Sequence, residues 1–408
     1  MNANYWLMNT RLETGFQVNK DIVTATNTKT SNLLIDNGKI KKITTSSDEI
    51  TDDLPRIDAK GTLALPSFIE KHCHLDKTLL EDEWRAGTPV NTIFERFEME
   101  KEVLSSLDTS TQERAKSLLD RYVDFGITHV RTHVDIYPEV GLKNLEDVKE
   151  VLERYDDKLT SEIVAFPQHG LLRSDSKELV RQALRNGASL IGGVDPATVD
   201  GDLEASLNAM VTLAVEEDAG IDLHLHDPSH LGIFTIKRLA ELTIKAGLQG
   251  KVTISHAYGL GDISVNEAEE IADLLEKAGV AIISSVPINR QFPPMGLLKE
   301  KGVSTAIGCD NIFDVWSPFG NGDILERAGR LAEASGWVDE RALAQTLSYI
   351  TGGKTPLSYE GEKLWPKAGD EANIVLVNAS CSADAVARRA ERVATIFKGK
   401  MTQNTSIH

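Results

Sequence analysis

Apolar and charged segments alternate through the middle of the chain. Short apolar runs, of the kind that form buried strands, are separated by charged segments with helical periodicity, such as TQERAKSLLDRYVDFG and SVNEAEEIADLLEKAG. Several of these segments end in glycine, the usual residue after a helix C-terminus. Eight apolar runs fit this scheme: TLALPSFIEKHCH, GITHVRTHVDI, SEIVAFPQHG, ASLIGGVDP, GIDLHLHD, KVTISHAYG, VAIISSVPI and VSTAIGCDN. Eight strands that alternate with helices predict a (β/α)8 barrel of the TIM type, an α/β fold.

The two ends of the chain follow a different pattern. LLIDNGKIKKI contains two alternating runs on either side of Asn37 and Gly38, a dipeptide typical of a tight hairpin turn. EANIVLVNAS and RVATIFKGKM, near the other end, also have strand character. We therefore predict one small β domain built from both termini, residues 1–60 plus 358–408, beside a barrel domain of residues 61–357.

The bulk composition narrows the classes of function. There are 44 Lys plus Arg against 62 Asp plus Glu, a net charge of −18, and no basic stripe indicates a nucleic-acid partner. No apolar run approaches the roughly 18 residues of a membrane-spanning helix, and the first residues do not resemble a secretory signal. The 3 cysteines are scattered without CxxC spacing, which fits a reducing compartment. We expect a cytoplasmic protein without nucleic-acid or membrane partners, and the sequence is compatible with a homo-oligomer.

Polar side chains follow the ends of several predicted barrel strands. His72 and His74 are separated by one residue in KHCHLDKT, and side chains two residues apart on a strand point to the same face. His224, His256 and Asp310 follow later strands. The C-terminal ends of the strands meet at one face of a TIM barrel, where active sites lie. Imidazoles and a carboxylate that converge there predict a zinc or iron site.

Six motifs carry a resemblance to a known family. They are HCHLDKT, HVRTHVDI, IVAFPQHG, IDLHLHD, TISHAYGL and GCDNIFDVWSPFG. Their types and order resemble the cytosine deaminase branch of the amidohydrolase superfamily, whose members also carry a flanking β-sandwich. The resemblance implies one divalent metal ion, Zn or Fe, with four ligands: His72, His74, His224 and Asp310. FPQHG and GGVDP contain no Lys or Glu that could bridge a second metal ion.

The resemblance also implies roles for residues around the metal. Asp310 would take the proton of the attacking water, and His256 would hold that water and the developing oxyanion. Asp227 stands where cytosine-specific enzymes have a glutamate that passes protons to a ring nitrogen. The positions that would contact the substrate are Gln168, at its amide edge, Asn311, which replaces a second aspartate of cytosine deaminases, and the aromatic Trp316.

Several other polar residues have simpler explanations. We expect His226 to pack or to hydrogen-bond beside the metal site, and His129 and His133 to belong to the barrel interior or to a polar network. Lys77 has two interpretations, a contact to a substrate anion or a structural ion pair with an acid such as Asp76. Asp314 is expected to fix its loop as a hydrogen-bond acceptor.

These features favour a metal-dependent hydrolase that acts on a non-peptide C–N bond. We expect a small nitrogen-containing cyclic substrate, with deamination of a cyclic amidine of the pyrimidine, triazine or pterin type. The shorter side chain of Asp227 leaves two alternatives open, hydrolysis of a cyclic amide and removal of an N-alkylamine from a triazine-type ring. A non-catalytic binding barrel is a further alternative, which retention of all four ligand positions and of His256 disfavours.

Overall fold

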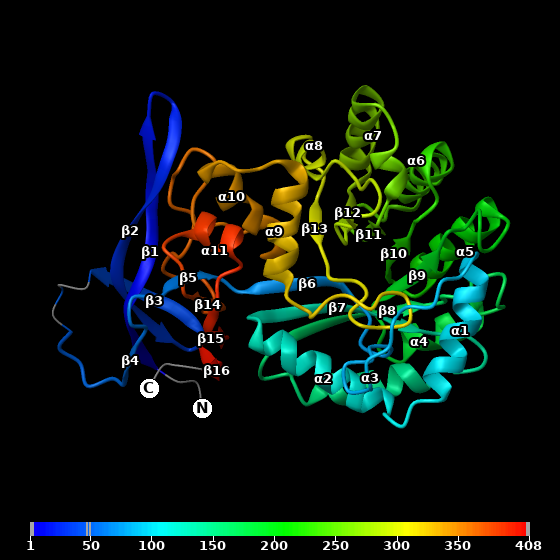
Figure 1. The fold of residues 1–408 in the computed structure, drawn as a ribbon, viewed down its shortest axis with the longest axis horizontal. Helices are drawn as coiled ribbons and strands as arrows, with labels where there is room; N and C mark the ends of the chain where they lie inside the picture. Colours follow the sequence, from blue (N-terminus) through cyan, green and yellow to red (C-terminus); the bar gives the residue numbers. More distant parts are fainter. Residues whose placement is uncertain (1–3, 46–47, 49, 405–408) are drawn as a thin grey trace.

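The barrel forms as predicted from the alternation of the sequence. The computed structural model describes residues 4–45, 48 and 50–404. Its central sheet is parallel, with the strands in sequence order: β6 (Phe68–Cys73), β7 (Ile127–Asp135), β8 (Thr160–Phe166), β9 (Leu190–Val194), β10 (Gly220–His224), β11 (Val252–Ser255), β12 (Val280–Ser284) and β13 (Thr305–Ile307). The fold class, a (β/α)8 barrel with a β domain built from both termini, is therefore confirmed (Figure 1).

Helices surround the barrel because each connection between neighbouring parallel strands must cross the outside of the sheet. They are α2 (Thr111–Asp124), α3 (Lys143–Glu153), α4 (Lys177–Arg185), α5 (Leu203–Glu216), α6 (Ser229–Ala246), α7 (Val265–Ala278), α8 (Met295–Glu300) and α9 (Ile324–Ser335). Helices α6 and α7 end at Gly247 and Gly279, whose φ angles of 69° and 59° are left-handed, as expected for glycine after a helix. None of the helices in the described residues is long and apolar enough to cross a membrane.

The terminal sheet joins the two ends of the chain. Its strand order is β16-β15-β14-β5-β1-β2-β3, and β4 pairs with β1. The strands are β1 (Tyr5–Asn19), β2 (Ile22–Asp36), β3 (Lys39–Thr45), β4 (Arg56–Asp58), β5 (Leu63–Pro66), β14 (Ile374–Val377), β15 (Arg392–Phe397) and β16 (Lys400–Asn404). The predicted hairpin turn lies between β2 and β3, where Asn37 and Gly38 have φ angles of 51° and 78°. Only Ser67 separates β5 from β6, so the terminal sheet leads directly into the first barrel strand.

Three of the helices in the described residues lie outside the regular alternation. Helices α10 (Glu340–Thr346) and α11 (Ser382–Arg388) lie between the barrel and the terminal sheet (Figure 1). Helix α1 (Ile93–Ser105) belongs to the long connection between β6 and α2. One face of α1 is buried at Phe97 and Glu100, so this inserted helix brings a carboxylate into the interior of the protein.

The barrel closes between its first and last strands. Cys73 and Asp310 form a parallel bridge, and the backbone N–H of Asp310 donates to the carbonyl of His72 at 2.7 Å. The buried carboxylate of Glu70 accepts from the backbone N–H groups of His72 (2.8 Å) and Cys309 (3.0 Å). A Cβ atom at Gly308 would lie 2.5 Å from the Cβ of His72, so only glycine permits this approach. Closure therefore places the HxH segment beside Asp310.

Candidate active site

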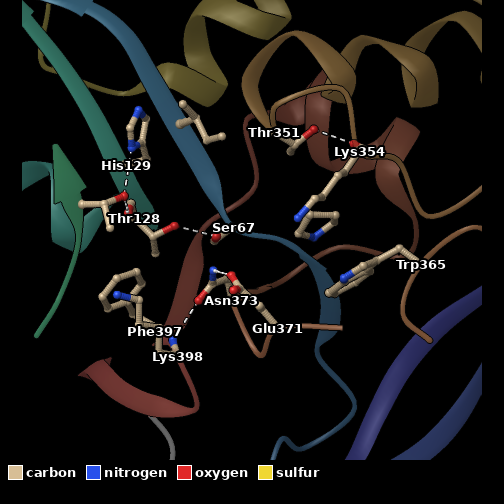
Figure 2. Close-up of a pocket in the computed structure, with 13 residues that line it drawn as sticks. Ser67, Thr128, His129, Thr351, Lys354, Trp365, Glu371, Asn373, Phe397 and Lys398 are labelled. Carbon is tan, nitrogen blue, oxygen red and sulfur yellow. Dashed lines mark hydrogen bonds between the residues drawn. The ribbon is translucent and has the colours of Figure 1, made fainter. Parts of the chain in front are cut away.

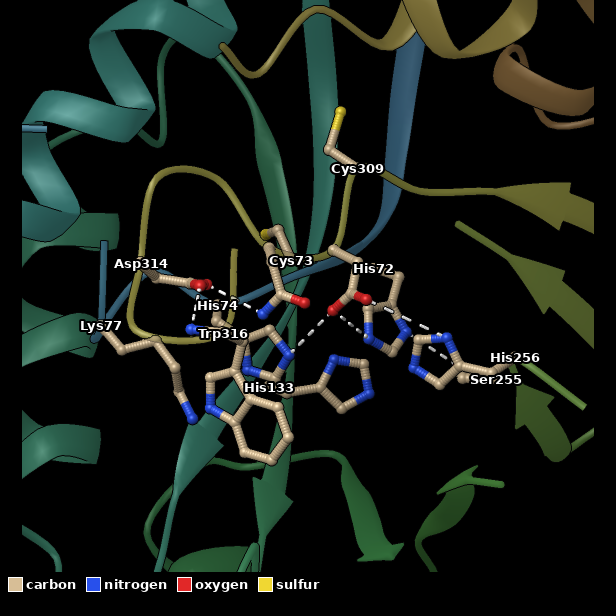
Figure 3. A network of polar contacts seen from close by, with 12 residues as sticks. His72, Cys73, His74, Lys77, His133, Ser255, His256, Cys309, Asp314 and Trp316 are labelled. Atoms are coloured by element: carbon tan, nitrogen blue, oxygen red, sulfur yellow. Dashed lines mark hydrogen bonds and ion pairs between the residues drawn. The ribbon is translucent and has the colours of Figure 1, made fainter. Parts of the chain in front are cut away.

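Five of the predicted site residues lie together at the C-terminal end of the barrel. His72 is on β6, His74 follows it, His224 ends β10, and His256 and Asp310 follow β11 and β13. Oδ1 of Asp310 lies 3.5 Å from Nε2 of both His72 and His74, two of the histidines that Figure 3 shows. The rings of His72 and His224 are 4.6 Å apart. Two ligands of a tetrahedral zinc ion lie roughly 3.4 Å apart, given metal–ligand distances of about 2.1 Å. The observed spacing is close to that value.

The polar atoms of this cluster match the donor set of a divalent cation. Among the described residues, Nε2 of His72, Nδ1 of His74 and both ring nitrogens of His224 are buried without a hydrogen-bond partner. Buried polar atoms in proteins are usually satisfied, so a group of unsatisfied nitrogens indicates that another partner binds there. Burial lowers the pKa of His74 and His224 well below the ordinary value, so both imidazoles are neutral at pH 7 with a lone pair available. The residues present fit a bound metal ion.

A hydrogen-bond chain behind His72 determines which of its nitrogens can bind the metal. The hydroxyl of Ser255 donates to Oδ1 of Asp222 at 2.7 Å, and it lies 2.8 Å from Nδ1 of His72. Because the hydroxyl proton points to Asp222, the hydroxyl oxygen accepts from Nδ1–H of His72. Nε2 then carries the free lone pair. Arg131 donates to the other oxygen of Asp222 at 2.8 Å, which completes the chain.

His133 belongs to the same group of imidazoles. Its ring lies 4.1 Å from that of His72 and 4.5 Å from that of His224. Burial lowers the pKa of His133 to about 4, so the side chain is neutral at pH 7. Its Nε2 lies 3.6 Å from Oδ1 of Asp222, beyond hydrogen-bonding distance. His133 therefore lies in the barrel interior, as expected, and directly beside the predicted ligands.

His256 is held by its backbone and keeps one free nitrogen. Its φ angle of 71° lies in the left-handed region, which a non-glycine residue adopts at a cost in energy and often at functional sites. The backbone N–H donates to the carbonyl of Ile283 at 2.8 Å, and Nδ1 lies 4.0 Å from Oδ2 of Asp310. Nε2 is buried and has no hydrogen-bond partner in the described part of the chain.

Asp195 organises the segment that contains His226 and Asp227. Its carboxylate accepts from the backbone N–H of Asp227 at 3.1 Å and lies 2.8 Å from Nδ1 of His226. His226 thus has an acid as its partner, which agrees with the expected hydrogen-bonding role. One oxygen of Asp227 accepts from the hydroxyl of Thr198, whereas Oδ2 is buried with no partner among the described residues. Burial raises the pKa of Asp227, a property that suits a group that exchanges protons.

The predicted substrate contacts lie in a second network, on the side of the cluster where Figure 3 shows Lys77 and Trp316. Lys77 donates to Oε1 of Gln168 at 2.6 Å and to Asp135 at 2.9 Å. Of the two interpretations of Lys77, the structure supports the ion pair, but its acids are Asp135 and Glu100. Asp76 instead accepts from the backbone N–H of Asp135 at 2.9 Å.

The loop after β13 is held by Asp314. Its Oδ1 accepts from the backbone N–H groups of Trp316 (2.8 Å) and Ser317 (2.9 Å), the loop-fixing role expected from the sequence. Its Oδ2 accepts from the side-chain amide of Asn311 at 2.9 Å. Asn311 and Trp316 are therefore both positioned by one buried carboxylate.

His129 lies at the opposite end of the barrel. Its Nδ1 is 2.8 Å from the hydroxyl of Thr160, and its Nε2 is 3.2 Å from Glu162. A cavity of about 140 Å³ opens there, between the first barrel strands and the terminal sheet (Figure 2). The hydroxyls of Ser67 and Thr128 in its wall already pair with each other at 2.6 Å. This cavity has no cluster of free ligand atoms among the described residues, in contrast to the other end of the barrel.

Comparison with known proteins identifies the family. The model of the amidohydrolase family matches residues 56–403. The chain belongs to the amidohydrolase family. N-isopropylammelide isopropyl amidohydrolase of Pseudomonas sp. (strain ADP) is 31% identical over 351 residues, 85% of this chain and 87% of the relative. These findings confirm the resemblance seen in the motifs and identify a hydrolase of carbon–nitrogen bonds other than peptide bonds.

Two solved structures resemble this amidohydrolase along almost its whole length. N-isopropylammelide isopropylaminohydrolase from Burkholderia multivorans ATCC 17616 superposes with a TM-score of 0.86 at 29% identity, covering 98% of both chains. The 5-methylcytosine deaminase from Klebsiella pneumoniae, liganded with phosphonocytosine, superposes with a TM-score of 0.80 at 27% identity, covering 99% of both chains. The two neighbours differ in the substrates that their names state, so the family and fold do not specify the substrate of this chain.

Five residues that contact the site were not identified as site residues from the sequence: Glu100, Asp135, Asp195, Asp222 and Ser255. Strand alternation provided a signal for one of them, because Asp222 is two residues before His224 and faces the same side of β10. Ser255 is the last residue of β11 and immediately precedes His256, and both side chains lie beside the ring of His72. Glu100 carried no such signal, since it lies in a helix outside the barrel repeat.

We predict one metal ion per chain, zinc or iron, bound by the four predicted ligands. Elemental analysis of the purified protein should give one equivalent. His224→Ala should lose most of this metal, because one of three imidazole ligands is removed, whereas His226→Ala should retain it. Two equivalents in the unmodified protein, or loss of metal from the His226 variant, would contradict the assignment.

Proposed function

We propose that this amidohydrolase hydrolyses the bond between a ring carbon and an exocyclic amine, with a cyclic amidine of the pyrimidine, triazine or pterin type as substrate and ammonia as product. One observation carries the proposal. Beside the four predicted ligands, both His256 and Asp227 keep a buried polar atom that no described residue satisfies. An attacking water and a departing nitrogen need two such groups, one on each side of the reacting carbon.

The groups present suit the steps of this reaction. A divalent cation held by His72, His74, His224 and Asp310 would supply the Lewis acid that makes water nucleophilic at neutral pH. Oδ2 of Asp310, on the side of the carboxylate nearer His256, is suited to receive the proton of the attacking water. His256 would then donate to the oxygen on which negative charge develops. Asp227, in its protonated form, would give its proton to the ring nitrogen as the water adds to the carbon. The proton held by Asp310 would then go to the amine, and Asp227 would take the remaining hydroxyl proton as the C–N bond breaks and ammonia leaves.

A second candidate function is the removal of an N-alkylamine from a triazine-type ring. It is favoured by the similarity to proteins named for N-isopropylammelide, at 31% identity in sequence and a TM-score of 0.86 in structure. The similarity to 5-methylcytosine deaminase is lower, at 27% identity and a TM-score of 0.80. The same side chains would serve both reactions, since only the substituent on the departing nitrogen differs.

A panel of ring compounds tested as substrates distinguishes the two candidate reactions. The metal-loaded protein is incubated with amino and isopropylamino forms of the same pyrimidines, triazines and pterins, and released ammonia and isopropylamine are quantified separately. Ammonia from any amino-substituted ring supports deamination, and isopropylamine alone supports the second candidate. Release of neither amine from any ring contradicts both.

We predict that cytosine is a poor substrate within this panel. The carboxylate of Asp227 is one methylene shorter than the glutamate of cytosine-specific enzymes, so it reaches a ring nitrogen only with a larger ring or through a bridging water. The measured kcat/KM for cytosine should lie about 10²-fold or more below that of the best ring, the scale of a misplaced proton-transfer group. Turnover of cytosine as efficient as that of the best ring would refute this expectation.

We predict that Asp227→Asn abolishes amine release and leaves the metal content unchanged. An amide cannot take and return the proton, yet it can still accept from Thr198, so the loop is preserved. The control is Asp218→Asn, an exposed aspartate that pairs with Lys251 at 2.7 Å and should behave like the unmodified protein. Near-normal activity of the Asp227 variant would show that this residue serves only the structure of its loop.

We predict that His256→Ala keeps its metal and loses about 10²-fold or more in kcat, the usual cost of removing a group that stabilises a developing oxyanion. The reason is that His256 acts in the transition state and is not a predicted ligand. Rate and metal content are measured on the same preparation. If metal content falls together with the rate, His256 is a ligand and this assignment is wrong.

A further inference from the structure

Helix α1 places a buried carboxylate among the predicted substrate contacts. Glu100 is 2% exposed, although α1 lies outside the regular alternation of strands and helices. Its Oε2 accepts from the indole N–H of Trp316 at 2.5 Å. Its Oε1 accepts from the side-chain amide of Gln168 and lies 3.4 Å from Nζ of Lys77. One carboxylate thus accepts hydrogen bonds from two of the three residues that are predicted to contact the substrate. These two residues, Gln168 and Trp316, come from different loops of the barrel.

These contacts determine which way the amide of Gln168 points. A carboxylate only accepts hydrogen bonds and an ammonium group only donates them. The amide nitrogen of Gln168 must therefore face Glu100, and its oxygen must face Lys77, which donates to it at 2.6 Å. Rotation of the amide by 180° would place a donor against Lys77 and an acceptor against Glu100, so the reversed orientation is strongly disfavoured.

The same comparison of donors and acceptors shows which N–H groups remain available to a substrate. Lys77 has three N–H groups and, within the described residues, three acceptors: Gln168, Asp135 and Glu100. It therefore has no N–H group to spare for a ring. The amide nitrogen of Gln168 has two N–H groups, and to the described part of the chain it donates one hydrogen bond, to Glu100. A second N–H remains, and its orientation is set by the first.

We propose that Glu100 is a positioning residue that determines specificity: it fixes Gln168 as a hydrogen-bond donor toward the substrate and holds the indole of Trp316 beside it. The site then selects rings that present an acceptor at this position, an oxo group or an unprotonated ring nitrogen. A ring with an amino group there would place donor against donor. This substrate class rests on the proposed function, whereas the hydrogen bonds of Glu100 do not.

The main test is Glu100→Gln. This substitution preserves the shape of the side chain and removes the carboxylate, which can only accept hydrogen bonds. Amine release is measured on pairs of rings that differ by an oxo or an amino group at the position away from the departing amine. We expect KM for the oxo ring to rise about 10-fold or more with a smaller change in kcat, and the preference for oxo over amino rings to fall by a similar factor. The control is Glu98→Gln, on the same helix, whose side chain is 65% exposed and which should keep the wild-type values.

A second measurement does not depend on turnover. The indole N–H resonance of Trp316, assigned by its loss in Trp316→Phe, should shift upfield in Glu100→Gln because its acceptor is no longer charged. Binding of uracil and of cyanuric acid, which carry oxo groups and no departing amine, is measured by titration. For each of these two compounds that binds the unmodified protein, Glu100→Gln should weaken the affinity by about 10-fold or more. The metal content and the melting temperature should stay unchanged.

The outcomes separate this inference from the proposed function. If the unmodified protein releases no amine from any ring, the proposed function has failed, and the resonance and binding measurements still decide the role of Glu100. An unchanged indole resonance, or an unchanged preference between oxo and amino rings, overturns the inference. So does an equal loss for all rings accompanied by loss of metal or of folding, because Glu100 would then be only structural.

Discussion

Closure of the barrel between β6 and β13 is the constraint on which the site depends. His72 lies on the first barrel strand, His74 directly follows it, and Asp310 follows the last strand, so the two histidines meet Asp310 only when the sheet closes. Glu70 joins the two strands through backbone N–H groups on both sides, and burial raises its pKa to about 7. The absence of a side chain at Gly308 allows the backbones to approach. The chemistry of the site is thus linked to the topology of the fold.

The strand ends and the inserted elements contribute differently to the active site. The predicted ligands and His256 lie on or just after barrel strands, so the parallel sheet itself sets their spacing. The side chains predicted to contact the substrate follow β8 and β13, and two of them, Gln168 and Trp316, are connected through Glu100 of α1. Strand positions are constrained by packing on both faces, whereas an inserted helix can change with little effect on the barrel. Relatives can therefore share a metal site and differ in substrate.

The sequence predicted what depends on local pattern and missed what depends on distant pairing. All eight barrel strands and the hairpin at Asn37 were predicted, because apolar runs, glycine caps and turn residues are local signals. The convergence of the histidines followed from the rule that parallel strands end at one face. The partners of Asp222 and Lys77 did not follow, because Arg131 and Asp135 are 91 and 58 residues away along the chain. Lys77 was paired with an acid such as Asp76, yet both residues lie in a turn after β6, and Lys77 donates instead to Asp135.

The buried histidines show why this arrangement is suited to a cation and not to a conventional core. Apolar side chains would fill the same space without the cost of desolvating ring nitrogens, which falls on any buried polar atom that lacks a partner. Here His72 has one nitrogen satisfied by Ser255, while its other nitrogen and those of His224 have no partner in the described residues. Asp222 and Asp195 nearby accept hydrogen bonds at both of their oxygens, whereas both ring nitrogens of His133 also have no partner in the described residues. Neutral imidazoles beside a carboxylate are the donors that a divalent metal ion requires, so this group of unsatisfied ring nitrogens is suited to bind one.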